Sequence, residues 1–276
     1  MYIGFELKKI DKGFFDDLDY YLNIGNKTAS KHQRIIEDIL DNFKNDNGSL
    51  DGDKMRSNWF PQINADIFLS HSHADENLVI AFAGWLKEEF GLECFIDSCI
   101  WGYSENLQRL LDKKYSHDED GKLIYRKVLE VSSHVHMMLN SALLQMIDNC
   151  ECVIFINTPK SVRPRDVINK IVSPWIYSEI GMTKLVKKKT IDEYRVKNLY
   201  ESRKEFSDFS IEYKLDTNHL TNLTINDLNH WRNIYPKRIG MISLSNHFKI
   251  NQKTNNNKLI KTALDYLYEF KASRII

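Results

Sequence analysis

The chain is poor in the residues that define several classes of protein. Its 276 residues include only 11 glycines and 5 prolines, against 13 tyrosines, 14 phenylalanines and 5 tryptophans. This composition excludes collagen-like, low-complexity and disordered chains, because 42% apolar residues can offset the entropy lost on ordering. Net charge is also lacking, since 38 basic residues balance 38 acidic ones. There is therefore no overall basic field to bind nucleic acid or an acidic membrane.

Cysteines are also few, and no long apolar run opens the chain. The four cysteines, Cys94, Cys99, Cys150 and Cys152, are too few for a disulfide scaffold. Charges interrupt the first 22 residues every few positions, so we expect neither a signal peptide nor a membrane span and place the protein in the cytoplasm. The spacings C-x4-C and C-x-C formally offer a four-thiolate metal site. However, Cys94 and Cys152 fall in strand-like apolar runs, where cysteine usually packs as a small hydrophobic residue, and we expect no metal.

The hydrophobic pattern predicts one α/β domain behind an N-terminal extension. Residues 1–60 are interpreted as the extension, partly helical near Ser30–Phe43, and they end in the turn-forming stretch NDNGSLDGD. From Ala65 onward, strand-like runs alternate with helical patterns, which is typical of a parallel sheet flanked by helices. We expect this domain to fill residues 61–276. Two insertions enlarge it, near residues 113–136 and 187–237.

Individual elements follow from the same pattern. Strands are expected at 65–69, 92–96 and 152–156, with weaker candidates at 207–215 and 238–244. Helices are expected at 75–90, 104–111, 137–147, from Pro174, at 225–233 and at 257–268. Gly91 suits a left-handed cap at the end of the first of these helices. Residues 98–103 are expected to form a loop.

Polar residues directly after the strands are the first candidates for a site, because ligands of open parallel sheets bind at the carboxyl ends of the strands. Ser70 and His71 follow the first strand, Asp97 and Trp101 the second, and Asn157 the third. G-x-G-x-x-G, P-loop and G-x-S-x-G motifs are all missing after these strands, which removes the usual support for a dehydrogenase, an NTPase or an α/β-hydrolase.

The segment SPWIYSEIGM carries the most informative pair. Trp175 and Glu179 are four residues apart at the start of a helix and therefore share a face. A tryptophan ring can stack on an aromatic base, and a carboxylate can accept from ribose hydroxyls and stabilise an oxocarbenium-like transition state. The same spacing also fits a core tryptophan beside a solvated glutamate. His71 and His73 are two residues apart without an evident third ligand, which favours polar loop residues over a metal site.

Four segments, taken in order, resemble the Toll/interleukin-1 receptor (TIR) domain. ADIFLSHSHAD resembles the family's first box, and FIDSCIWGYSENL resembles its second strand and BB loop. CVIFINTP and SPWIYSEIGM resemble the third strand and the helix that bears the catalytic glutamate. WIYSE is similar to the W-x-x-x-E of bacterial members. The BB loop departs from the family because Gly102 stands without a neighbouring proline.

The resemblance implies a flavodoxin-like α/β fold and an NAD+ glycohydrolase or ADP-ribosyl cyclase activity that cleaves the nicotinamide–ribose bond. NAD+ would be the substrate, with no separate cofactor. Glu179 would be the catalytic carboxylate and Trp175 a stacking wall, with the pocket lined by Ser70, His71, Asp97 and Trp101. The family also implies self-association through TIR–TIR contacts, a downstream effector that senses a nucleotide product, and a place in bacterial anti-phage defence.

Two other functions stay open at this point. The family contains non-catalytic adaptors, and the segment 98–103 would be a contact loop in such an interaction module. Flavodoxin-like enzymes that transfer nucleosides also use a glutamate, so base exchange on free nucleosides is a third reading.

Overall fold

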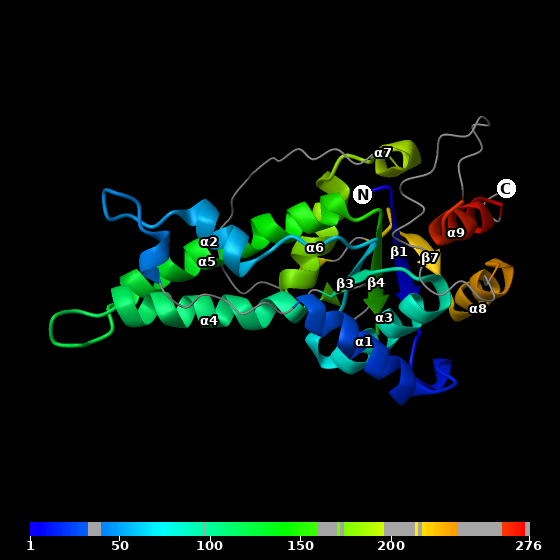
Figure 1. Ribbon diagram of the computed structural model, residues 1–276, viewed down its shortest axis with the longest axis horizontal. Helices are drawn as coiled ribbons and strands as arrows, with labels where there is room; N and C mark the ends of the chain where they lie inside the picture. The colour runs from blue at the N-terminus through cyan, green and yellow to red at the C-terminus, as the bar shows by residue number, and fades with distance from the viewer. Residues whose placement is uncertain are drawn as a thin grey trace.

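The computed structural model describes residues 1–32, 40–96, 98–158, 170–171, 174–195, 213–214, 217–236 and 261–273. At its centre lies a five-stranded sheet in the order β3-β2-β4-β1-β7, with every neighbouring pair parallel (Figure 1). The strands are β1 (Ile3–Lys8), β2 (Ile67–Ser70), β3 (Cys94–Ile96), β4 (Cys152–Asn157) and β7 (Thr221–Leu223). A parallel sheet flanked by helices in a flavodoxin-like arrangement confirms the expected fold class.

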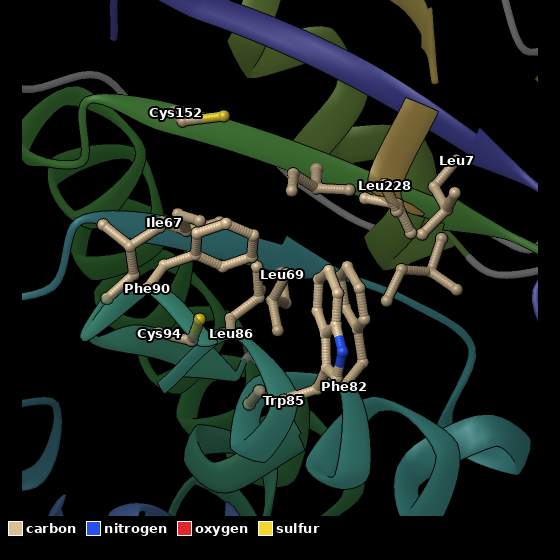
Figure 2. Packing of buried hydrophobic residues seen from close by; sticks show 14 of the residues in the cluster. Leu7, Ile67, Leu69, Phe82, Trp85, Leu86, Phe90, Cys94, Cys152 and Leu228 are labelled. Atoms are coloured by element: carbon tan, nitrogen blue, oxygen red, sulfur yellow. The ribbon is translucent and has the colours of Figure 1, made fainter. Parts of the chain in front are cut away.

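One face of the sheet packs against α1 (Leu18–His32), α3 (Glu76–Phe90), α8 (Ile225–Ile234) and α9 (Ala263–Ala272). Figure 2 shows the centre of this layer, where Phe82, Trp85 and Leu86 of α3 approach Leu69 of β2. Phe90 and Trp231 stack with ring centroids 3.8 Å apart, which joins α3 to α8. Apolar burial and aromatic stacking therefore fix this side of the sheet.

The opposite face is covered by α2 (Gly52–Trp59), α4 (Ser98–Tyr115), α5 (Tyr125–Asn149) and α6 (Pro174–Leu185). The strand side chains that point to this side include Phe68, Phe95 and Val153, which alternate with those of the first face. Shorter elements complete the described chain. They are η1 (Lys12–Phe14), η2 (Leu40–Phe43), η3 (His73–Asp75), α7 (Ile191–Arg195) and the antiparallel pair β5 (Lys170–Ile171) and β6 (Tyr213–Lys214).

Strand β1 changes how residues 1–60 are understood. It pairs with β4 along Ile3–Lys8 and with β7 along Phe5–Leu7, so it lies in the interior of the sheet. A flavodoxin-like sheet has the strand order 2-1-3-4-5. Here β3, β2, β4 and β7 stand at the positions of strands 2, 1, 3 and 5, and β1 stands at the position of strand 4 although it comes first in the chain. The first strand of the expected extension, residues 3–8, is thus part of the sheet. Its pattern is atypical of a central strand because Glu6 interrupts the apolar run.

Helices α4 and α5 correct the expectation for residues 98–136. The segment 98–103 belongs to α4 instead of a loop. The expected insertion at 113–136 consists of the last turn of α4, a connection over residues 116–124 and the first half of α5 (Figure 1). The expected helix 137–147 is the second half of α5. Its first half looks irregular in sequence because it is mostly solvent-exposed, with Arg126 and Glu130 forming an i,i+4 ion pair at 3.3 Å.

The remaining expectations fare unevenly. The helices expected at 75–90 and 225–233 are confirmed by α3 and α8, and Gly91 caps α3 with a φ of 70°. The tail helix is confirmed in part by α9. Three expectations cannot be compared in full, because the described residues do not include the candidate strand 238–244, most of the candidate strand 207–215, or residues 33–39 of the expected helix near Ser30–Phe43. Among the described residues, no helix combines the length and apolarity needed to cross a bilayer.

Candidate functional site

The site lies where β2 and β4 end side by side. The chain leaves β2 towards β3 on the side of α3, and it returns from β3 to β4 through α4 and α5 on the other face. Connections of opposite sense diverge at this point, and in open α/β sheets such a switch point is where ligands bind. Ser70 is the last residue of β2 and pairs with Phe155 of β4.

Ser70 and Glu179 form the polar centre of this site. The Ser70 hydroxyl donates to Glu179 Oε2 at 2.7 Å. Both side chains are buried, with 0% and 1% of their surface exposed. Around them lies an apolar cluster of Phe155, Ile176, Ile180 and Leu220. A carboxylate held in apolar surroundings interacts strongly with any positive charge that develops beside it, because little water is present to screen the interaction.

Trp175, which was expected to form a stacking wall beside Glu179, packs against a side chain of α5. Its ring stacks on His136 of α5, with centroids 5.2 Å apart and planes inclined by 20°. Its neighbour on α6, Ser178, donates to Asn140 of the same helix α5 at 3.4 Å. Trp175 therefore ties α6 to α5, while Glu179 one turn later faces the end of β2.

The two histidines of SHSHAD point into different environments. His71 is 3% exposed, and its Nδ1 lies 3.4 Å from the Leu69 carbonyl oxygen. The side chain of His73 is 79% exposed and lies 3.9 Å from a Glu76 carboxylate oxygen. Buried Asp75 accepts a hydrogen bond from the Thr158 hydroxyl. The described residues contain no group of three or more His, Cys, Asp or Glu placed to hold a metal ion.

The remaining predicted site residues are less informative. Asp97 lies outside the described residues, and Trp101 is placed only as part of the α4 backbone. The structure thus brings Ser70 and Glu179 together, with His71 next in the chain and Trp175 one turn away.

A second buried carboxylate, which was not predicted from the sequence, lies on the same face of the sheet. Glu6, Phe155 and Ser70 occupy one row across β1, β4 and β2, so the two polar residues flank the phenylalanine. Glu6 is 5% exposed and accepts from Asn157 Nδ2 at 2.7 Å and from Thr217 Oγ1 at 3.2 Å. The acid inside the apolar run GFEL was the available signal.

A cleft of about 480 Å³ opens at the carboxyl ends of β1, β2 and β4. It is lined by Ile10–Lys12, by His73–Leu78 and by Thr158. Small-molecule sites commonly have volumes of about 300–1000 Å³, so a ligand of moderate size fits beside the strand ends.

Comparison with known proteins identifies no relative of this chain. No family model, curated protein or solved structure matches the chain. The chemistry of Ser70, Glu179 and their surroundings is therefore what indicates the function.

Proposed function

We propose that this protein is a TIR-type enzyme that cleaves the nicotinamide–ribose bond of NAD+, as a glycohydrolase or an ADP-ribosyl cyclase. The observation that carries the proposal is the buried Ser70–Glu179 hydrogen bond at the end of β2, beside the switch point of the sheet. The order of the TIR-like segments in the sequence supports the same reading.

The reaction requires the protein to orient the ribose and to supply a negative charge beside it. Nicotinamide departs as a neutral molecule when the C1′–N bond breaks, and the bonding electrons leave with it. Positive charge develops on the ribose, where the Glu179 carboxylate stabilises it. Ser70 holds that carboxylate in one orientation, which lowers the cost of reorganisation during the reaction. Water attacking C1′ then gives ADP-ribose and a proton, whereas a nitrogen of the adenine attacking C1′ gives a cyclic product.

Access to Glu179 requires movement of α6 or of its neighbours, because only 1% of the residue is exposed. We therefore expect the isolated protein to turn over slowly and to be activated when copies assemble. This agrees with the self-association that the TIR resemblance implies. We place the enzyme in the cytoplasm, in an anti-phage response where loss of NAD+ or a nucleotide product sensed by an effector gives the output.

The decisive experiment incubates purified full-length protein with NAD+, with and without a crowding agent, and identifies the products by mass spectrometry. Glu179→Gln keeps the shape of the side chain and removes its charge, so we expect turnover to fall by on the order of 10²-fold or more. Glu89→Gln is the matched control, because Glu89 is also buried, at 7% exposure, but lies on α3. Equal turnover in the two variants, or intact NAD+ with the wild-type protein under both conditions, overturns the proposal.

A non-catalytic interaction module is the second candidate, and one surface favours it. Leu123, Tyr125 and Leu129 are 58%, 72% and 49% exposed where α5 begins. Clustered exposed apolar side chains often mark a contact surface. If Glu179→Gln retains full biological activity and Tyr125→Ser with Leu129→Ser abolishes it, the interaction module is correct and the enzyme is not.

A further inference from the structure

A second cavity lies between α2 and the paired helices α4 and α5, which extend together away from the sheet (Figure 1). Its volume is about 1060 Å³. The walls come from residues 45–56, from Leu111 and Tyr115 on α4, and from residues 131–141 on α5. These stretches lie outside the four TIR-like segments. Segments outside the TIR-like motifs thus form a cavity that has no part in the proposed reaction.

The lining of this cavity has an apolar floor. Met55, Leu111 and Met138 are 1%, 5% and 7% exposed, and partly buried Leu50 and Val131 adjoin them. Methionine and leucine side chains adapt to irregular apolar ligands. A site of this size, with an apolar floor and a few polar groups, is typical of small-molecule binding.

The rim of the cavity carries charges of both signs. Arg56 donates to Gln145 Oε1 at 3.1 Å, and Asp51 pairs with Lys54 at 3.5 Å. Asp53, His134 and Tyr115 also line the cavity and are charged or titratable. Because no sign dominates, the rim offers hydrogen bonds without a field that would attract a strongly charged ligand.

Helix α5 connects this cavity to the candidate active site. Val131, His134 and Met138 line the cavity, while His136 and Asn140 on the same helix contact α6. The contacted residues of α6 are Trp175 and Ser178, which lie four residues and one residue before Glu179. Through these contacts a displacement of α5 by a bound molecule would also shift the helix that holds the carboxylate.

We propose that this cavity binds an uncharged, largely apolar small molecule with a hydrogen-bonding group, and that α5 transmits its binding to α6. The binding site stands independently of the enzyme activity. Its regulatory meaning, control of the position of Glu179, rests on the proposed function.

The binding test uses N-phenyl-1-naphthylamine, a neutral probe whose fluorescence rises in apolar sites, with the full-length protein. We expect one saturable site. Ser141→Trp and Val131→Phe fill the cavity by different amounts and weaken binding at least tenfold, whereas Lys127→Trp, on exposed α5 surface, does not. Circular dichroism verifies that each variant is folded. Absence of saturable binding to wild type, or an affinity equal to that of wild type in both cavity variants, overturns the site.

The transmission test measures amide hydrogen exchange in α6 (174–185) with and without saturating probe, in the absence of NAD+. We expect exchange to slow at least twofold in wild type. His136→Ala, which removes the ring under Trp175, keeps the probe affinity and loses this effect. Unchanged exchange in the wild type refutes the coupling. Because neither test uses NAD+, a failure here is distinct from a failure of the proposed enzyme activity.

Discussion

Helices α1 and α3 contact each other backbone to backbone at two glycines, and this makes a sharp prediction about stability. A Cβ placed on Gly84 would lie 1.9 Å from the Tyr21 carbonyl oxygen, and one on Gly25 would lie 1.9 Å from the Ile80 carbonyl oxygen. Side chains can rotate out of the way, but helix backbone cannot. Gly84→Ala therefore requires the two helices to separate by about an ångström.

The magnitude follows from comparison with Gly181→Ala in α6, where no described atom beyond the adjoining residues and the backbone of the same helix lies within 4 Å of the added Cβ. Both changes gain about 1 kcal/mol from the better helix propensity of alanine. Gly84→Ala also overpacks a buried contact, which costs about 3 kcal/mol for a clash that only backbone movement relieves. We expect Gly181→Ala to stabilise the protein by about 1 kcal/mol and Gly84→Ala to destabilise it by about 2 kcal/mol.

Urea unfolding and calorimetry measure this difference. For a chain of this size, 1 kcal/mol corresponds to about 2–4 °C in Tm, so Gly84→Ala is expected to melt about 4–8 °C below wild type. Gly25→Ala should behave like Gly84→Ala. The double variant should lose less stability than the sum of the two single variants, because one separation of α1 and α3 relieves both clashes. Equal stability of Gly84→Ala and Gly181→Ala would refute the close approach of α1 and α3.

Two further predictions concern titration and thiol reactivity. Burial opposes ionisation of Asp227, but hydrogen bonds from Thr224 and Lys271 outweigh it and lower the pKa of this carboxyl. Its stabilisation is complete above the unfolded-state pKa of about 3.9 and is lost as pH falls through the lower folded-state pKa, so Asp227→Asn flattens the pH dependence of the unfolding free energy below about pH 4. Burial raises the pKa of Cys94 and Cys152, so we expect mass spectrometry to find both unlabelled by a thiol reagent at pH 8 in native protein and labelled in urea.

The strands and helices with clear boundaries were predictable from the sequence. β2, β3 and β4 are short apolar runs, and α3 is rich in apolar residues at helical spacing and is capped by Gly91. Each of these signals is local and depends on the spacing of neighbouring residues. The parallel sheet flanked by helices followed from their alternation along the chain, whereas its flavodoxin-like form was implied only by the TIR resemblance.

Other features were not predictable because they arise from contacts between distant segments. Glu6 looks out of place in a buried strand until Asn157 and Thr217 supply its hydrogen bonds. For the same reason, spacing placed Trp175 and Glu179 on one helix but could not assign them different partners, His136 and Ser70. Candidate residues can thus be recognised in the sequence, whereas the partners that their side chains contact cannot.

The position of β1 has a consequence for biosynthesis. This strand is translated before all others, yet its two neighbours, β4 and β7, are made long afterwards. During most of translation β1 has no partner, so the middle of the sheet is completed late and through contacts between segments distant in sequence, which slow folding. A chain shortened by β1 alone would keep a gap between β4 and β7, which a separate peptide carrying β1 would fill as an added strand.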